Sequence, residues 1–288
     1  MLLDDLLTSR PVITDGAWGT QLQARGLSGG LCPDAWNLSH PDQVAEVPRA
    51  YVAAGSQIVL TNTFRANRIA LASYDLVDQM AAINRAGVEI SRKAAGPQAR
   101  VFASIGPTGK MLMAGEVTPE EVQTAFTEQA AALAAAGADA LVIETMAELE
   151  EAELAVAAAR TTGLPVVACV VFDSGAQFDR TMMGVAPEEA AQRLDACGAD
   201  IVGANCGQGI AGYVDICRRM RTATDKPLWI KANAGTPVIV DGQVTYRTSP
   251  AEFAACGPAL IEAGAQFIGG CCGTSPDYIR ALCQEIGR

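Results

Sequence analysis

At 288 residues, of which 50 % are apolar, the chain has ample material for one large domain or two ordinary ones. The formal net charge of −11 argues against a nucleic-acid partner, because phosphate binding needs a basic face, and the absence of any run of about 18 apolar residues argues against a membrane-spanning helix. The chain has nine cysteines but is too long to need disulfide bonds for stability, which favours a reducing compartment. Its first residues lack the basic region of a signal peptide, so we expect a cytoplasmic protein.

Short apolar runs alternate with helical stretches along the chain. The eight runs are 12–14, 57–61, 101–105, 140–143, 166–171, 201–203, 228–231 and 267–268. Helices are expected to start where a proline is followed closely by an acidic residue, at Pro41, Pro119, Pro187, Pro250 and Pro276. Several helices are expected to end at an Ala-Gly or Cys-Gly pair, at 54–55, 136–137, 197–198 and 263–264.

This alternation predicts parallel strands that are covered by helices. Eight such units in a chain of this length match a (β/α)₈ TIM barrel, for which about 250 residues are typical. A doubly wound open sheet is the alternative. No linker and no shift in composition divides the chain, so we expect residues 1–288 to form a single domain.

The reactive groups of such barrels lie at the C-terminal ends of the strands. Polar residues that close or follow the apolar runs are therefore candidates for the site. They are Asp15, Asn62, Thr63, Ser104, Glu144, Asp173, Asn205, Cys206, Asn233, Cys271 and Cys272.

Three cysteines form the strongest pattern among these candidates. Cys271 and Cys272 stand between glycines, and Cys206 follows an earlier apolar run. Adjacent side chains on a regular strand point to opposite faces, but the flanking glycines can adopt backbone angles that turn both sulfurs toward one point. Three thiolates on a rigid frame would form a zinc site with one open position, as in catalytic zinc sites. A tight turn of small residues, or a redox-active vicinal pair, would explain the Cys271–Cys272 spacing as well.

The other candidates have plainer explanations. Free cysteine is among the most buried residue types, so packing better explains Cys32, Cys169, Cys197, Cys217, Cys256 and Cys283. His40, the single histidine, precedes a helix and is expected at the surface or as a cap, which excludes a Ser-His-Asp triad. Asp15 and Glu144 are also compatible with strand-end acids that accept hydrogen bonds from backbone amides.

The chain resembles the homocysteine-binding domain of zinc-dependent homocysteine S-methyltransferases over nearly its whole length. The resemblance implies a (β/α)₈ barrel in which Cys206, Cys271 and Cys272 are the zinc ligands. The segments that carry it are 15–20, 61–64, 104–109, 144–145, 203–206, 233–235 and 269–274, and the last of these together with the separate Asn-Cys pair is the most specific.

The same resemblance implies where homocysteine binds. Asp15 and Glu144 would receive its amino group, and backbone amides near Gly16 and Ala17 would receive its carboxylate. A free thiol, with a pKa of about 8.5, is mostly protonated at neutral pH, whereas zinc deprotonates a coordinating thiol. The substrate sulfur would replace water or a weak neutral ligand on the zinc, accept a methyl group and leave as methionine. Asn233 is a candidate for that weak ligand, and an amide that only neighbours the metal site is the plainer alternative.

Two kinds of methyl donor are compatible with these residues. Segment 233–237, followed by Val240-Asp241-Gly242, is most similar to cobalamin-dependent methionine synthases, in which another domain carries methylcobalamin. The chain ends at Arg288, so we expect a separate corrinoid protein as partner, with a small donor such as S-methylmethionine as the alternative.

Betaine is less favoured as the donor. The relatives that use betaine enclose its quaternary ammonium with aromatic side chains, whereas Cys32, Arg65 and Thr145 stand at the corresponding places here. A zinc or thiol-redox module without methyltransferase activity is an alternative of a different class.

Overall fold

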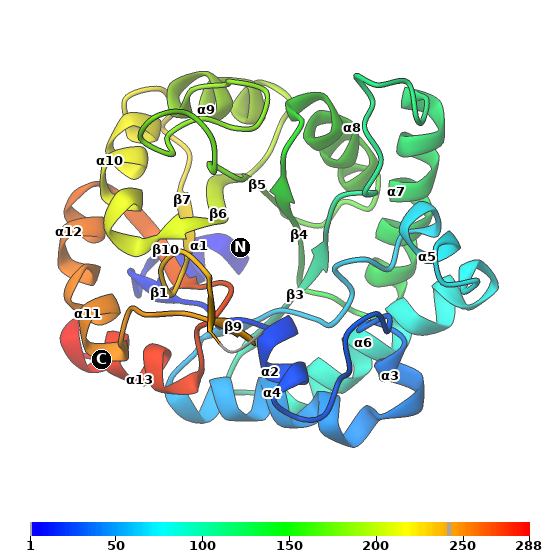
Figure 1. Cartoon of the computed structure of the whole chain (residues 1–288), viewed down its shortest axis with the longest axis horizontal. Helices are drawn as coiled ribbons and strands as arrows, with labels where there is room; N and C mark the ends of the chain where they lie inside the picture. The colour runs from blue at the N-terminus through cyan, green and yellow to red at the C-terminus, as the bar shows by residue number, and fades with distance from the viewer. Residues whose placement is uncertain (1, 241–242) are drawn as a thin grey trace.

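The computed structural model describes residues 2–240 and 243–288, so Asp241 and Gly242 lie outside the described residues. Eight parallel strands form one sheet in the order β1-β10-β7-β6-β5-β4-β3-β2, and the sheet curls into a barrel (Figure 1). All eight apolar runs contribute a strand, which confirms the predicted barrel. The strands are β1 (Val12–Ile13), β2 (Ile58–Val59), β3 (Arg100–Ile105), β4 (Ala140–Met146), β5 (Val166–Val170), β6 (Ile201–Gly209), β7 (Leu228–Asn233) and β10 (Ala265–Gly270).

Helices surround this barrel as an outer ring (Figure 1). The helix starts at Thr118 and Ser249 carry full capping boxes, in which the hydroxyl accepts the amide of the glutamate three residues later and that glutamate accepts the amide of the cap. The helices are α1 (Leu2–Leu7), α2 (Gly19–Gln23), α3 (Trp36–Ser39), α4 (Pro41–Ala54), α5 (Arg68–Ala72), η1 (Val77–Gln79), α6 (Met80–Ala95), α7 (Pro119–Ala135), α8 (Leu149–Arg160), α9 (Pro187–Ala196), α10 (Ile210–Arg221), α11 (Pro250–Ala255), α12 (Gly257–Glu262) and α13 (Pro276–Glu285).

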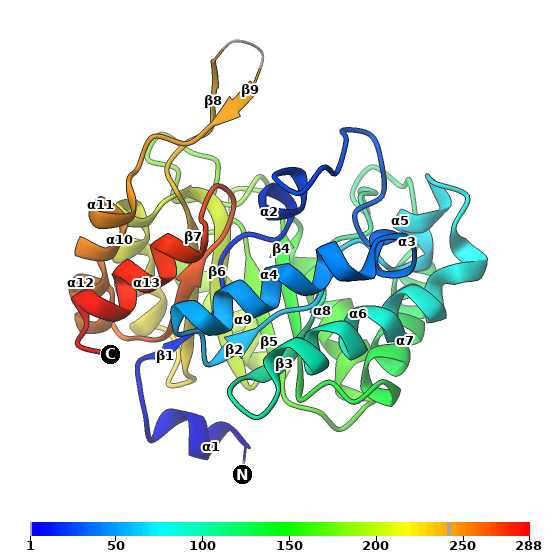
Figure 2. The same cartoon turned by 90° about the horizontal axis from the view of Figure 1, so that it is seen from below.

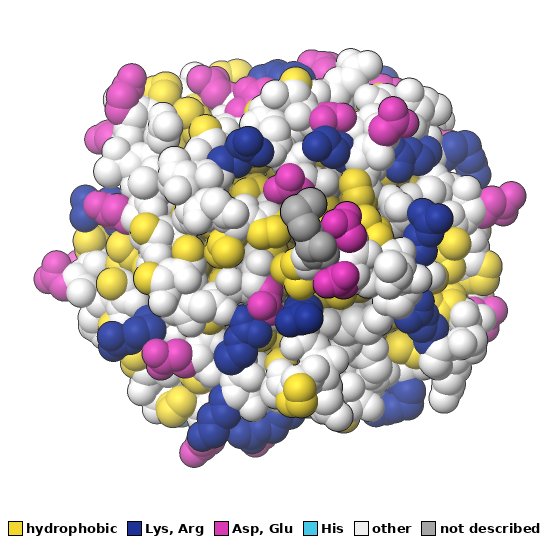
Figure 3. Space-filling model, turned by 180° about the vertical axis from the view of Figure 1, so that it is seen from behind, with side chains coloured by type: hydrophobic (Ala, Val, Ile, Leu, Met, Phe, Trp, Pro, Cys, Tyr) yellow, Lys and Arg dark blue, Asp and Glu magenta, His cyan; other side chains and the backbone are white. Residues whose placement is uncertain are grey.

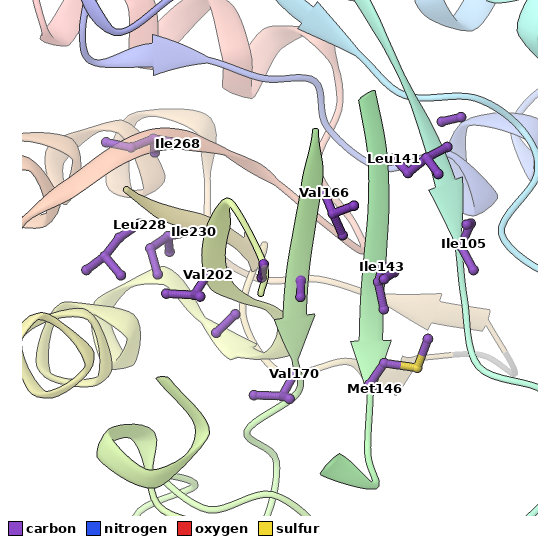
Figure 4. Packing of buried hydrophobic residues seen from close by; sticks show 14 of the residues in the cluster. Ile105, Leu141, Ile143, Met146, Val166, Val170, Val202, Leu228, Ile230 and Ile268 are labelled. Carbon is purple, nitrogen blue, oxygen red and sulfur yellow. The ribbon is translucent and has the colours of Figure 1, made fainter. Parts of the chain in front are cut away.

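The core has two shells, because successive strand residues point to opposite faces. On β4, Leu141 and Ile143 face the helices, and other strands add side chains to the same outer shell (Figure 4). Ala140 and Val142 face the barrel interior. There Trp229 stacks between Phe102 and Phe267, with ring centroids 6.0 and 5.4 Å away.

The two ends of the barrel differ. Leu6 of α1 joins the interior cluster, and α1 lies at the end opposite the β8–β9 hairpin, formed by β8 (Val238–Val240) and β9 (Gln243–Thr245) (Figure 2). The sequence analysis did not predict this hairpin, although an Asp-Gly pair between two β-prone stretches, as in residues 238–245, is a strong hairpin signal. The α1 end shows acidic and basic side chains interspersed (Figure 3). None of the described helices has the length and apolar character needed to cross a membrane.

The barrel closes between β1 and β2 through isolated hydrogen bonds. Within the described residues no ladder joins these strands. Instead, the Gln57 amide donates to Ile13 O at 2.8 Å, and the Ser56 hydroxyl donates to Thr14 O at 3.2 Å. Farther along the seam, the Leu60 amide donates to the carboxylate of Asp15 at 2.7 Å. A candidate site residue therefore takes part in closing the barrel.

Candidate active site

Three sulfurs converge at the C-terminal ends of β6 and β10. The Sγ atoms of Cys206, Cys271 and Cys272 all lie within 4.8 Å of one another, and those of Cys206 and Cys272 are 3.9 Å apart. Tetrahedral zinc with Zn–S bonds of about 2.3 Å separates its sulfurs by about 3.8 Å. The structure thus brings together the three cysteines that the sequence singled out, at a spacing that fits zinc.

The backbone around these cysteines is bent to aim them. Cys206 has a φ of +64°, uncommon for a residue other than glycine, and the register of β6 against β7 shifts between Cys206 and Gly209. Such a bulge redirects a side chain at a strand end. After β10, the Cys271 amide donates to Ala232 O at 2.7 Å, and Cys272 O accepts the Ala234 amide at 3.0 Å. The end of β7 therefore holds the paired cysteines in place.

Crowding and burial shift the acidity of these thiols. The hydrogen bond with Cys271 lowers the pKa of Cys206. The contact with Cys272 and burial raise it by more, so the pKa lies at about 12. The pKa of Cys272 is also raised to about 12, where Cys206 lowers it but Cys271 and burial raise it. The protein alone therefore disfavours three thiolates at this place, and a dication is the partner that would favour them.

Glu144 lies at the end of β4, beside the sulfur cluster. Its Oε1 accepts a hydrogen bond of 2.5 Å from the Ser104 hydroxyl, and its Oε2 accepts one of 3.4 Å from Asn205 Nδ2. Burial raises the pKa of Glu144, whereas the charge of Lys231 and the Ser104 hydroxyl lower it. Glu144 is thus a buried carboxylate with one oxygen only weakly bound by the protein.

Asp15 is bound more tightly than Glu144. Its Oδ1 forms an ion pair with Lys231 Nζ, and its Oδ2 accepts from Trp18 Nε1 at 2.8 Å as well as from the Leu60 amide. The sequence interpretation placed Lys231 in a strand but gave it no role in the site. The available signal was a lysine at the end of an apolar, buried strand, where a lysine needs an acidic partner.

The turn after β1 packs against the loop that carries Cys271 and Cys272. Thr274 Oγ1 accepts the Ala17 amide at 3.0 Å and donates to Cys271 O at 2.7 Å. A side chain at Gly16 would place a carbon 2.6 Å from the Tyr51 hydroxyl, so this position requires glycine. The Ala17 amide already has a protein partner, and its expected contact with a substrate carboxylate stays a prediction.

Asn233 closes β7 next to the paired cysteines. Its Nδ2 donates to Gly207 O at 2.9 Å, while its Oδ1 is buried and has no hydrogen-bond partner among the described residues. A buried oxygen without a partner is rare in folded proteins. Asn233 therefore offers a free oxygen at this end of the barrel.

Several residues considered from the sequence have structural partners instead. Asn62 Nδ2 donates to Pro33 O, and Thr63 Oγ1 donates to Ser104 O. His40 is exposed and stacks on Trp36, with no side-chain hydrogen bond that caps α4. Four of the other cysteines are buried, whereas Cys197 and Cys256 are half-buried at helix ends.

Comparison with known proteins identifies the family. The model of the homocysteine S-methyltransferase family matches residues 12–286. The chain belongs to the homocysteine S-methyltransferase family. It is 31 % identical to methionine synthase of Mycobacterium leprae (strain TN) over 305 residues, which cover 99 % of this chain and 25 % of that protein. The chain thus spans about a quarter of the length of these mycobacterial relatives.

The chain covers larger shares of two further relatives. Betaine–homocysteine S-methyltransferase 1 of Danio rerio is 30 % identical over 318 residues, which cover 99 % of this chain and 75 % of that protein. The metallated homocysteine methyltransferase MmuM from Escherichia coli is 27 % identical, with a TM-score of 0.80 and coverage of 97 % and 98 % of the two chains. The predicted family and barrel fold are confirmed.

Proposed function

We propose that this homocysteine S-methyltransferase binds zinc through Cys206, Cys271 and Cys272 and methylates homocysteine to methionine. The convergence of the three sulfurs at the spacing of a tetrahedral zinc site carries the proposal. Zinc bound there would supply the Lewis acidity that converts the substrate thiol to a thiolate at neutral pH. Asn233, with its unpartnered Oδ1, is our candidate for a weak ligand that the substrate sulfur replaces.

The amino group of homocysteine is drawn to the acidic side of the site. Asp15 and Glu144 carry two negative charges there, and Lys231 carries one positive charge, so the remaining single negative charge matches one ammonium group. The substrate carboxylate is placed at the turn formed by Gly16 and Ala17. Fixing both ends of the amino acid holds its sulfur at the cysteine cluster and lowers the entropic cost of reaching the transition state.

A methylcorrinoid, carried by another domain or protein, is the proposed donor. The identity with methionine synthases, of which the chain spans only a quarter, supports it. This chain matches MmuM, a homocysteine methyltransferase, over 98 % of its length, which supports the alternative of a single-domain enzyme that uses a small donor such as S-methylmethionine. Betaine is disfavoured because non-aromatic residues occupy the three compared places: Cys32 is buried, the Arg65 amide is bonded to Asp34, and Thr145 is bonded to Asn205.

The test supplies purified, zinc-loaded protein with homocysteine and with methylcobalamin, S-methylmethionine or betaine in parallel, and measures methionine. We expect methionine from methylcobalamin, lost on removal of zinc and in Cys206→Ser but retained in Cys256→Ser, whose thiol lies outside the cluster. Methionine from S-methylmethionine alone would overturn the proposed donor. If the protein bound no zinc when zinc was supplied, made no methionine and formed a reversible Cys271–Cys272 disulfide, it would instead be a redox module.

A further inference from the structure

Lys231 is a buried cation that the proposed function uses only to balance the charge of the site. Its side chain is 2 % exposed, and its Nζ pairs with Asp15 Oδ1. It lies on β7, opposite Asn205 of β6 and Gly269 of β10, directly under the mouth of the barrel. A lysine in such a place is normally paired, and here the pair uses one of the two carboxylates expected to bind substrate.

Asp15 has little capacity left for a ligand. Besides Lys231, it accepts hydrogen bonds from Trp18 Nε1 and from the Leu60 amide, and it is 0 % exposed. The Leu60 bond belongs to the seam between β1 and β2, where no strand ladder satisfies the backbone. Asp15 therefore serves the frame of the barrel, and its charge is already matched.

Glu144 is in the opposite situation. It is 8 % exposed, and its Oε2 accepts only the 3.4 Å bond from Asn205 Nδ2. The charge of Lys231 acts on Glu144 and lowers its pKa, but none of the described lysines or arginines forms an ion pair with it. Glu144 therefore retains both an acceptor oxygen and access to the mouth of the barrel.

On the basis of the proposed function, we propose that Glu144 alone contacts the ammonium group of homocysteine, whereas Asp15 only positions its own neighbours, Lys231, Trp18 and Leu60. The Asp15–Lys231 pair is a positioning unit that closes the barrel seam beneath the substrate. A direct contact with Asp15 would bring two cations, the lysine and the substrate ammonium, to one fully buried carboxylate, where their repulsion is strong because the dielectric is low. The family resemblance implies that both acids receive the ammonium group, whereas in this chain Glu144 alone receives it.

Binding of homocysteine is compared with binding of its desamino analogue, a mercaptobutyrate with a terminal thiol, by titration calorimetry on the zinc-loaded protein. Loss of a buried ammonium–carboxylate contact should weaken wild-type binding of the analogue by about 30-fold or more. The measured quantity is the ratio of the two dissociation constants, that of the analogue divided by that of homocysteine. In Glu144→Gln that ratio should fall to within about threefold of unity. Glu151→Gln, which alters a buried carboxylate bonded to Thr108 instead, is the matched control and should keep the wild-type ratio.

The deciding variant is Asp15→Asn combined with Lys231→Met. Removing a buried ion pair as a unit is tolerated far better than removing one partner, so this double variant should fold. We expect it to keep the wild-type ratio to within about threefold, even if both ligands bind more weakly. A ratio that collapses as it does in Glu144→Gln would show direct contact by Asp15 and overturn the proposal, as would an unchanged ratio in Glu144→Gln. If wild-type protein bound neither thiol, the proposed function itself would fail.

Discussion

Asn205 and Thr145 bind each other twice at the mouth of the barrel. The Thr145 amide donates to Asn205 Oδ1 at 2.7 Å, and Asn205 Nδ2 donates to Thr145 Oγ1 at 2.6 Å. The same Nδ2 lies 3.4 Å from Glu144 Oε2 and 3.9 Å from Cys271 Sγ. Thr145 has a φ of +63°, which is strained for a β-branched residue. One amide therefore connects a strained turn, the carboxylate proposed to bind substrate and a cysteine of the proposed zinc site.

Asn205→Ala should weaken homocysteine binding. It leaves the Thr145 amide without its partner and removes the hydrogen bond that orients Glu144, at a cost of about 2 kcal/mol in the free energy of unfolding. Asn84→Ala is the matched control, because Asn84 is equally buried but donates to Ala66 O and Met80 O away from the cysteines. Urea unfolding and calorimetric titration should show similar stability losses for both variants, but weaker homocysteine binding only for Asn205→Ala. Equal affinities would contradict the role given to Asn205.

Substituting Gly273 and Gly163 by alanine distinguishes an effect on the backbone from an effect on the cysteine site. Both have positive φ values, of +81° and +74°. A carbon added at Gly273 would overlap the ring of Tyr246, whereas one added at Gly163 would meet nothing within 4 Å. Gly163→Ala should therefore cost about 1 kcal/mol of stability and leave zinc binding unchanged. Gly273→Ala should cost more and also lower zinc affinity, measured by competition with a chelator. Unchanged zinc affinity in Gly273→Ala would show that the Tyr246 contact does not shape the site.

Asp34 should make the protein less stable at neutral pH than at mildly acidic pH. Burial raises the pKa of its carboxyl from 3.8 to about 6, although the hydrogen bond from the Arg65 amide lowers it. The folded protein therefore holds this proton more tightly than the unfolded chain does. The resulting stabilisation is fully present below the unfolded pKa of 3.8 and is lost as the pH rises through about 6.

Asp34→Asn tests this dependence, because the amide keeps the acceptor for Arg65 N–H and carries no charge. Relative to wild type, the variant should gain about 2–3 kcal/mol in free energy of unfolding between mildly acidic and neutral pH. Urea unfolding of both proteins near pH 4 and near pH 7 measures it, at a constant salt concentration. A stability difference that is the same at both pH values would sink the prediction.

The barrel could be predicted from the sequence because its signals are local. Buried strands appear as apolar runs, and helix starts such as Thr118-Pro119 carry their own capping residues. The cysteine cluster could be predicted in part, since Cys271 and Cys272 are adjacent and flanked by glycines. The positive φ of Cys206 could not, because tertiary contacts impose that strain on a residue that does not favour it.

The ion pair between Asp15 and Lys231 could not be predicted from the sequence pattern either. The two residues are 216 positions apart, and no local periodicity links them. The seam between β1 and β2 is another example, since the carboxylate of Asp15 replaces a ladder that strand patterns alone would predict to be complete. Both features depend on how the barrel closes, which composition and spacing do not specify.

The metal content of the purified protein tests the central claim most directly. After dialysis against metal-free buffer, wild type and Cys256→Ser should each retain about one zinc per chain, since three thiolates bind zinc tightly while its fourth position stays open. Cys206→Ser should lose that zinc, as should Cys271→Ser and Cys272→Ser, while each variant stays folded by circular dichroism. Full retention of zinc by folded Cys206→Ser would contradict a site built from both β6 and β10.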